Sequence, residues 1–274
     1  MGGLSEIEFL SNGTRFRAYL PSSEVWGSAK DVLLFNEYEL MPSFSLPSLK
    51  GGTVVDVGAQ VGLYSLKVST YAKEVVSVEP SIWKSSLLRT NVARNSVNNI
   101  EVRQEAIWSS KGAVKFTDGG AGMVSSLVGV STGYDVKTTT LDDIVESVGH
   151  VDLLKMDVEG AEYESLLSAK SETLKSIDRI VAEIHVFRSD HEFLLEKIQG
   201  RLRDSRKTTK LIPLPFQTTF DGLTKPWGTS LTAINGHDPF VFRLSLSLVY
   251  SARPIIVGLK TRMDIGSHYL LYAN

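Results

Sequence analysis

The sequence predicts a doubly wound α/β fold, in which helices cover both faces of a mainly parallel sheet. The first observation is an apolar, β-branched run at 53–57 that ends in small residues and continues as a helical pattern from Leu63. The second is a similar unit one step downstream, where the run from Glu74 to Val78 precedes a helical pattern at 85–95. Strands that alternate with helices in this way form a parallel sheet. Further apolar runs of strand length lie at 100–102, 151–154 and 180–184.

The turn after the first strand runs from Asp56 through Gly58, Ala59 and Gln60 to Gly62. Gly58 lets the backbone turn sharply without a Cβ, and Gly62 lets the following helix approach the strand or a ligand. Asp56 stands where the strand ends, so it can fix amides of the loop or attract a cationic ligand. A glycine turn after a strand is common, and alone it does not establish nucleotide binding.

The second strand ends in an acid, Glu79, followed by Pro80. A carboxylate at this point can accept both hydrogen bonds from a ribose diol, as the acidic residue of dinucleotide folds does. A lone glutamate at a strand end is usually solvated. The order and spacing of the glycine turn and Glu79 together predict a nucleoside site.

The glycine spacing distinguishes between nucleoside ligands. A dinucleotide site uses G-x-G-x-x-G so that a diphosphate can sit on the helix N-terminus. Here an acid, Asp56, and a bulky amide, Gln60, occupy the loop, which suits a diphosphate poorly. S-adenosylmethionine carries an ammonium and a ribose diol and has no phosphate, so it is the expected cofactor, and an NAD-dependent dehydrogenase is the weaker alternative.

The composition limits the classes of protein to which this chain can belong. The chain has 274 residues, 42% of them hydrophobic, which suffices for one large core with extensions. It has 29 Lys and Arg against 31 Asp and Glu, so we expect no general nucleic-acid binding. It contains no cysteine, and its first residues lack the pattern of a signal peptide, so we expect a cytoplasmic protein. The apolar segment 240–250 is too short to span a bilayer.

Residues 1–49 are expected to form an extension or cap that precedes a core domain at 50–274. Alternating residues around Asn12-Gly13 predict a hairpin, and 22–44 has a mostly helical pattern. This extension either covers the cofactor site or only packs against the sheet. A late insertion at about 216–253 has no clear pattern, and apolar runs at 254–259 and 269–272 predict terminal strands.

The third strand, at 100–102, leads to Glu105 and Ala106, which should lie where an adenine is held. Trp108 follows as either a wall of that site or a core residue. A further strand is expected at 111–116, and a Gly- and Ser-rich loop at 119–133.

Acidic and basic residues follow the fourth and fifth strands. Lys155, Asp157 and Glu159 come after the run 151–154, and Glu183 and His185 lie at the end of the next strand. Alternation places Lys155 and Asp157 on one side. We therefore expect these residues at the same crevice as the glycine turn. The helix at 192–202 should follow, with its basic end, from Arg201 to Lys210, in solvent.

These residues resemble the FkbM-type S-adenosylmethionine-dependent methyltransferases over about residues 50–190. The motifs that carry the resemblance are Val55–Ser65, Val78–Pro80, Thr140–Asp143 and, most specifically, Leu154–Glu162. The resemblance implies a seven-stranded class I methyltransferase sheet, S-adenosylmethionine as methyl donor, and methylation of a hydroxyl on a small molecule, sugar or other metabolite. Members commonly have Asn where this chain has Gln60.

Methyl transfer from a sulfonium is an in-line displacement, so the protein aligns donor and acceptor and can take up the proton of the alcohol. The candidate bases are Asp157, Glu159 and His185, with Lys155 or Glu183 able to adjust them. The alternatives are helix capping for the two acids and simple packing for the histidine. A divalent metal on Asp157, Glu159, Glu183 and His185 is conceivable, but their spacing matches no dedicated metal motif, so none is required.

Two other classes of function stay open at this point. A nucleic-acid methyltransferase of the amino-methylating type carries Asn/Asp-Pro-Pro-aromatic after the fourth strand, where this chain has Asp157-Val158-Glu159-Gly160. A noncatalytic S-adenosylmethionine-binding protein on the same fold would keep the cofactor residues without transferring a methyl group.

Overall fold

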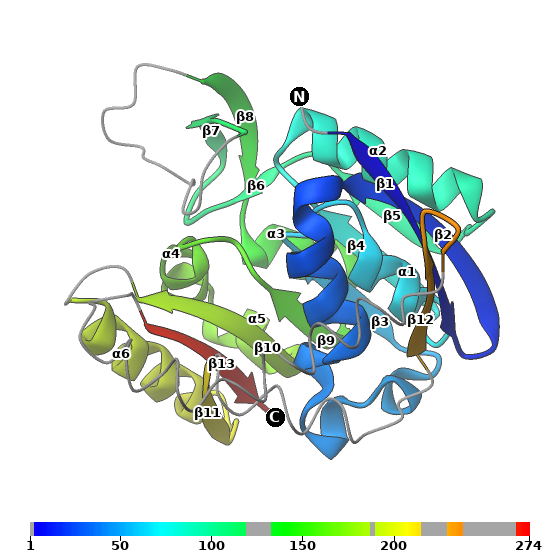
Figure 1. Ribbon diagram of the computed structural model, residues 1–274. Coiled ribbons are helices and arrows are strands. Elements are labelled where there is room, and N and C mark those ends of the chain that lie inside the picture. The colour runs from blue at the N-terminus through cyan, green and yellow to red at the C-terminus, as the bar shows by residue number, and fades with distance from the viewer. Residues whose placement is uncertain (1–2, 119–132, 187–189, 215–228, 238–266) are drawn as a thin grey trace, which may run out of the picture.

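The computed structural model describes residues 3–118, 133–186, 190–214, 229–237 and 267–274. Its centre is a seven-stranded sheet with the order β11-β13-β10-β9-β3-β4-β5 (Figure 1). The five strands from β5 to β10 run parallel, and β13 runs antiparallel to both of its neighbours. This arrangement confirms the predicted doubly wound fold. The strands are β3 (Thr53–Val57), β4 (Glu74–Val78), β5 (Ile100–Arg103), β9 (Val151–Met156), β10 (Ile177–Val186), β11 (Thr209–Leu214) and β13 (Ser267–Ala273).

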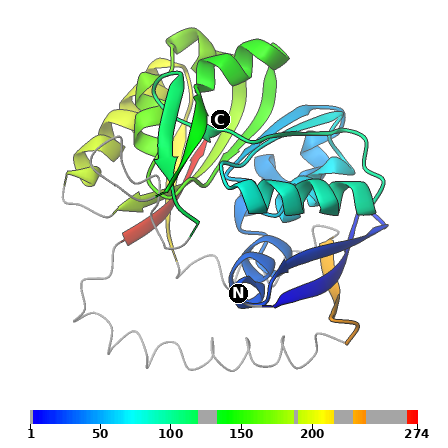
Figure 2. The same cartoon turned by 90° about the horizontal axis from the view of Figure 1, so that it is seen from above.

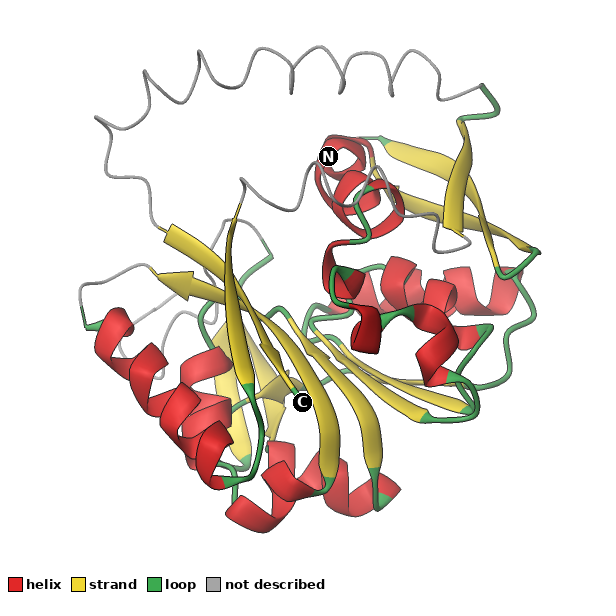
Figure 3. Cartoon of the chain, turned by 90° about the horizontal axis from the view of Figure 1, so that it is seen from below, coloured by secondary structure: helices red, strands yellow, loops and turns green. Residues whose placement is uncertain are grey.

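Alternate residues of the central strands pack against opposite layers, as the twofold period of a strand requires. Val54 belongs to the cluster with α1 and the N-terminal segment, whereas Val55 faces the cluster with α3 to α6. Both residues are fully buried, so these strands are apolar on both faces. Figure 3 shows the helices on the two sides of the sheet. They are α1 (Leu63–Ser69), α2 (Ile82–Arg94), α3 (Leu141–Val148), α4 (Glu162–Ser168), α5 (Ser171–Lys175) and α6 (His191–Asp204).

The strand order reverses between β3 and β9. From β3 the chain builds outward through β4 to β5, and then returns to the other side of β3 to place β9 and β10. The carboxyl ends of β3 and β9 therefore lie side by side, followed by Gly58 and Asp157. In open α/β sheets a crevice for ligands forms at this point.

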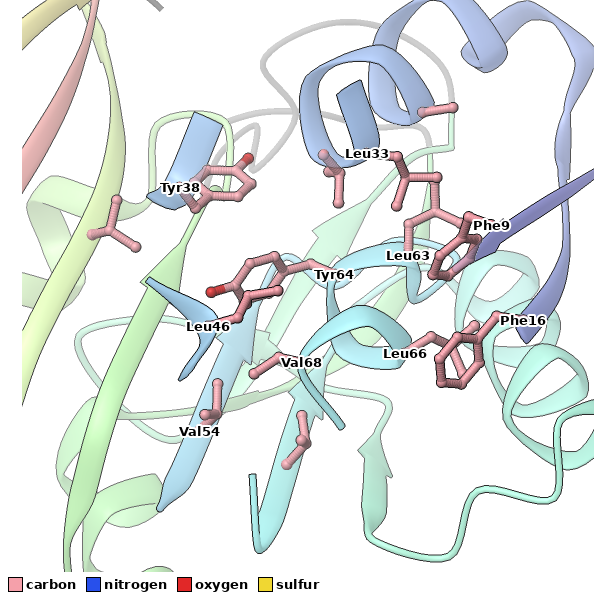
Figure 4. Close-up of a cluster of buried hydrophobic side chains, with 14 of the residues drawn as sticks. Phe9, Phe16, Leu33, Tyr38, Leu46, Val54, Leu63, Tyr64, Leu66 and Val68 are labelled. Atoms are coloured by element: carbon pink, nitrogen blue, oxygen red, sulfur yellow. The ribbon is translucent and has the colours of Figure 1, made fainter. Parts of the chain in front are cut away.

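The N-terminal residues form the predicted hairpin, β1 (Leu4–Ser11) and β2 (Thr14–Pro21). Asn12 and Gly13 form its turn, both with positive φ. The strand β12 (Thr229–Ile234), within the late insertion, pairs with β1 and completes a three-stranded sheet (Figures 1 and 2). The stacked rings of Phe9 and Phe16 lie beside α1 in the core (Figure 4).

Helical turns connect this small sheet to the core, as the pattern at 22–44 predicts. The longest, η2, has π-type hydrogen bonds, such as the one from the Phe35 amide to the Lys30 carbonyl. The fully buried Lys67 of α1 anchors these turns, because its ammonium donates to the Val32 carbonyl and to the carboxylate of Glu39. The turns are η1 (Ser22–Glu24), η2 (Val25–Leu34), η3 (Glu37–Glu39), η4 (Pro42–Phe44) and η5 (Leu46–Leu49).

A third sheet has three short strands, and Ile107 of its first strand belongs to the core cluster of the main sheet. It has the order β6-β8-β7 and consists of β6 (Ala106–Ile107), β7 (Gly112–Phe116) and β8 (Tyr134–Thr139). The strand expected at 111–116 is therefore present, but in this small sheet. The loop expected at 119–133 lies outside the described residues except for Gly133.

The C-terminal part corrects one expectation from the sequence. The segment from Arg201 to Lys210 is not simply a solvated helix end. Lys207 is buried and donates to the carbonyls of Ile177 and Asp178, and β11 begins at Thr209 as the edge strand of the main sheet. The charge is tolerated because backbone carbonyls satisfy the ammonium. The strand expected at 269–272 is present in β13, and 254–259 lies outside the described residues.

No helix among the described residues is long and apolar enough to cross a membrane. The segment 240–250 lies outside those residues.

Candidate active site

A cavity of 430 Å³ opens at the carboxyl ends of β3, β4 and β9. Eight of the site residues predicted from the sequence line it, from β6 and from the loops that follow β3, β4, β5 and β9. They are Gly58, Gln60, Glu79, Pro80, Glu105, Ala106, Asp157 and Glu159. The structure thus brings together at one crevice residues that are up to 101 positions apart in the chain.

Gly58 is required where the first and fourth strands meet. It has φ of 78°, and a Cβ at this position would lie 1.7 Å from the carbonyl oxygen of Asp157. The amide of Asp157 donates to the carbonyl of Val57 at 3.0 Å, which continues the strand pairing to the cavity edge. Any side chain at residue 58 would push the two loops apart.

Glu79 is buried and holds the glycine turn in place. One carboxylate oxygen accepts the amide of Gln60 at 2.8 Å, and the other accepts the amide of Ser81 at 2.9 Å. Burial raises the pKa of Glu79, and the two amides only partly offset this effect. Gln60 has φ of 49°, a left-handed conformation that its hydrogen bond to Glu79 supports. Each oxygen of Glu79 keeps a second lone pair for a ligand.

The far side of this cavity is lined by Ala106 and Ile107 of β6 together with Trp83 of α2. Trp83 was not expected there, although it lies only four residues after Glu79. Trp108, which the sequence offered as either a wall of the site or a core residue, packs against the core cluster of α3 to α6. Glu105 forms an ion pair with Lys137 at 2.6 Å.

A second cavity, of 220 Å³, lies between η2 and the ends of β3, β9 and β10. Ala59 and Lys155 line it, as do Gly58, Gln60, Asp157 and Glu159, which also line the first cavity. The remaining wall includes the acids Asp31, Glu37 and Glu183. The N-terminal extension therefore borders both cavities, because Ser28 of η2 lines each of them.

Two acids of the second cavity, Glu37 and Glu183, are harder to ionise than an exposed carboxyl group. Burial raises the pKa of Glu37 well above its ordinary value, and the charges of Asp31 and Asp157 add to this effect. Burial and the charge of Asp157 likewise raise the pKa of Glu183. Perturbed carboxyl groups that line one cavity are typical of sites that move protons.

Lys155 lines the second cavity but is nearly fully buried. Its ammonium is 3.2 Å from a carboxylate oxygen of Asp56, its direct partner on β3, and donates to the Gly58 carbonyl at 3.0 Å. Burial lowers the pKa of Lys155, but the charges of Asp56 and Asp157 outweigh this effect and raise it above its ordinary value. Lys155 therefore holds the turn as a cation.

Tyr38 of η3 positions Asp157. Its hydroxyl donates to a carboxylate oxygen of Asp157 at 3.1 Å, while its ring lies 5.1 Å from the Lys155 ammonium. The ring packs edge-on against Tyr64 of α1 (Figure 4). Burial raises the pKa of Tyr38 well above its ordinary value, so it remains a hydrogen-bond donor.

Glu162 organises the loop that carries Asp157 and Glu159. It is fully buried and accepts the amides of Val158 at 3.1 Å and Gly160 at 2.8 Å. Glu159, between these two residues, has φ of 55°, a conformation that a non-glycine residue rarely adopts. Glu162 thus fixes the backbone of the loop before α4, and this loop conformation places Asp157 and Glu159 at the cavities.

His185 lies behind these acids and is not among the residues that line the two cavities in the described part of the chain. Its Nδ1 is 3.0 Å from Glu162, and its Nε2 is 3.5 Å from Glu159 and 3.6 Å from Glu183. Burial lowers the pKa of His185, but the hydrogen bond to Glu162 and the surrounding carboxylates outweigh it and raise the pKa to about 10.

Two other predicted residues, Asp56 and Gly62, stabilise the elements around the site. Asp56 is fully buried and accepts the hydroxyl of Ser65 at 2.6 Å, so it joins β3 to α1 rather than lining a cavity. At Gly62 a Cβ would come within 2.8 Å of Leu88, so this glycine allows α2 to pack closely. The sequence reasoning did not identify Ser28, Glu37 or Tyr38, because no motif marks them.

A family model described as the methyltransferase FkbM domain matches residues 56–206, more than half of the chain. The match contains all the predicted site residues, and it begins after η1 to η5. No curated protein matches the sequence.

Solved structures with similar folds include the methyltransferase FkbM from Methylobacillus flagellatus KT. It is 17% identical, with a TM-score of 0.43, and the match covers 59% of this chain and 40% of that chain. This chain thus spans less than half of that protein. An rRNA methylase from Streptococcus thermophilus is 12% identical over 63% of this chain and 84% of its own, with a TM-score of 0.41. A precorrin-6y C5,15-methyltransferase from Geobacter metallireducens is 11% identical over 84% of each chain, with a TM-score of 0.38.

Proposed function

Because this chain belongs to the FkbM methyltransferase family, we propose that it transfers the methyl group of S-adenosylmethionine to a hydroxyl group of a small molecule. The observation that carries this proposal is the pair of cavities that share one boundary. Ser28, Gly58, Gln60, Asp157 and Glu159 line both of them. A donor in the larger cavity and an acceptor in the smaller one would meet at this boundary.

The larger cavity suits the nucleoside of the cofactor. Glu79 can accept the ribose hydroxyls, and Trp83 with Ala106 and Ile107 offers an apolar wall for the adenine. The positive sulfonium would then lie near Asp157 and Glu159, where negative charge favours it.

The smaller cavity suits a hydroxylated acceptor. In the reaction the acceptor oxygen attacks the methyl carbon, the carbon–sulfur bond breaks, and the proton of the hydroxyl passes to a base. Asp157 and Glu159 stand at the boundary where this proton is released. The protein contributes mainly alignment of the two reactants, which can supply about 7–11 kcal/mol of the barrier reduction.

The first test is calorimetric titration with S-adenosylhomocysteine, with NAD as the control ligand. Glu79→Ala should weaken binding about 10- to 100-fold, because the ribose hydroxyls lose a charged acceptor worth about 1.5–3 kcal/mol. Glu74→Ala, a matched change at the other end of β4, should leave affinity unchanged. Failure of the folded wild-type protein to bind, or equal affinity in Glu79→Ala, would contradict the cofactor assignment.

The acceptor class needs a second measurement. Methyl-labelled S-adenosylmethionine is incubated with a panel of sugars, polyols and phenols, and the labelled product is treated with alkali. A methyl ether resists this treatment, whereas a methyl ester releases methanol. Label that is lost in alkali, or found on nitrogen, would refute transfer to a hydroxyl.

A further inference from the structure

Two metal-ligating side chains, Asp157 and Glu159, line the boundary of the two cavities, and a third, His185, lies directly behind them. Asp157, Glu159 and His185 each offer one ligand atom, and these atoms all lie within 4.8 Å of one another. The Nε2 of His185 is 3.5 Å from the carboxylate of Glu159. Two ligands bonded to one tetrahedral ion at about 2.1 Å are separated by about 3.4 Å. The separation in this cluster therefore fits two atoms that share an ion.

The imidazole of His185 is held in the orientation that a metal ligand needs. Its Nδ1 is 3.0 Å from Glu162, which is fully buried and fixed by the amides of Val158 and Gly160. Metal-binding histidines usually donate their second ring nitrogen to a carboxylate in this way. With Nδ1 bonded to Glu162, Nε2 is the ring nitrogen that faces an ion, and it lies on the side of Glu159 and Glu183.

The two carboxylates are also positioned by neighbours. The Tyr38 hydroxyl bonds one oxygen of Asp157, and Glu162 fixes the loop on both sides of Glu159. The Glu159 side chain is 45% exposed, so an ion can reach it from the cavity. His185 lies on the inner side, and its side chain is 4% exposed.

We propose that Asp157, Glu159 and His185 bind one divalent first-row metal ion, with Mn²⁺ or Zn²⁺ suited to this mixture of imidazole and carboxylate ligands. Three protein ligands leave coordination positions open toward the cavity of 220 Å³. A hydroxylated molecule could bind there through its oxygen, and the ion would make that hydroxyl more acidic. Glu183 lines the same cavity and, in its ionised form, would receive the proton. This last role rests on the proposed methyl transfer, whereas the ion site itself does not.

A second cluster in the chain provides a matched control. His150, Asp152 and Asp178 also bring their ligand atoms within 4.8 Å of one another, at the opposite ends of β9 and β10. His150 and Asp178 are exposed, and Asp152 already accepts the amide of Thr53 at 2.8 Å. The same substitution can therefore be made in each cluster.

The test is calorimetric titration of chelator-treated full-length protein with Mn²⁺, followed by electron paramagnetic resonance of the bound ion. We expect one site per chain. His185→Gln and Glu159→Gln should weaken it roughly 100-fold and 10-fold, and His150→Gln should leave it unchanged. Because Glu159 is half exposed, its variant should fold even if His185→Gln does not.

Several outcomes would overturn the proposal. These are no Mn²⁺ binding, equal binding by Glu159→Gln and the wild type, or loss of binding in His150→Gln. The same variants are titrated with S-adenosylhomocysteine. Cofactor binding without Mn²⁺ binding would reject the metal site alone, and Mn²⁺ binding without cofactor binding would reject the proposed function alone.

Discussion

The two cavities differ in how their acids are held. In the larger one, Glu79 accepts two backbone amides, and Glu24 and Glu105 are paired with lysines at 3.3 Å and 2.6 Å. In the smaller one, burial raises the pKa of Glu37 and Glu183 well above their ordinary values. Hydrogen bonds and ion pairs favour the charged form of an acid, whereas neighbouring carboxylates in the smaller cavity add to burial and favour the protonated forms of Glu37 and Glu183.

The two cavities also differ in which parts of the chain build them. The larger is formed mainly by the ends of β3, β4, β6 and β9, which lie within the residues matched by the family model. The smaller needs η2 and η3, which lie outside that match. The family match therefore covers most of the larger cavity, whereas part of the wall of the smaller one comes from the N-terminal segment that precedes the match.

The largest effect should come from breaking the anchor of that wall. Lys67 is fully buried and donates to the Val32 carbonyl, the side chain of Asn36 and the carboxylate of Glu39. Lys67→Met leaves the carboxylate of Glu39 buried without its cation, which should lower the free energy of unfolding by about 3–5 kcal/mol. Urea denaturation measures the change.

The control for this prediction is the double variant Lys67→Met/Glu39→Leu. Removing both charges should restore much of the lost stability, because an apolar pair of similar size is often as stable as a buried ion pair. If the double variant were as unstable as the single one, the ion pair would not be the cause. S-adenosylhomocysteine affinity of the folded double variant then shows whether the wall matters to the larger cavity.

Gly58→Ala should lower stability less than Lys67→Met does, but it should abolish S-adenosylhomocysteine binding. The new methyl group would overlap the Asp157 carbonyl at the wall that both cavities share. We expect a loss of about 2–4 kcal/mol in stability and no detectable S-adenosylhomocysteine binding. Gly51→Ala is the matched control, because Gly51 has the same φ of 78° and nothing within 4 Å. Gly51→Ala should lower stability by about 1 kcal/mol and leave S-adenosylhomocysteine binding intact. Equal losses of stability and binding at the two positions would show that backbone strain, and not the close approach to Asp157, causes the effect.

Local pattern was enough to predict most of the sheet. Apolar runs followed by glycine or an acid located β3, β4, β9 and β10, because buried parallel strands are apolar on both faces. The edge strand β11 was not predicted, because Lys210 and Pro213 interrupt its apolar residues. The boundary at residue 50 between extension and core stays a prediction.

The site shows the same division. Residues in the loops after strands could be predicted, because the carboxyl ends of parallel strands meet at one edge. Trp83 and Tyr38 could not be predicted in this way. Each reaches the crevice because a helix or turn packs in a particular orientation, and residue spacing does not determine that orientation. Glu162 could be singled out as part of a motif, yet its hydrogen bonds to Val158, Gly160 and His185 depend on the folded loop.

The smallest expected effect tests the contrast between the acids directly, through the pH dependence of Glu37→Gln. Burial, followed by the charges of Asp31 and Asp157, raises the folded pKa of Glu37 above its unfolded value. The native state therefore binds the extra proton, so this group's contribution to stability is complete below about pH 4.5 and is lost as the pH rises through the folded pKa. Glu37→Gln removes the group, so its stability should equal that of the wild type near pH 4 and exceed it by roughly 1 kcal/mol at pH 8. Glu24→Gln, in the larger cavity, instead removes a partner of Lys84 and should give no such gain. Thermal unfolding of the wild type and the two variants between pH 4 and pH 8 measures these differences in stability. If the difference between Glu37→Gln and the wild type were the same at all pH values, the acids of the two cavities would be held alike.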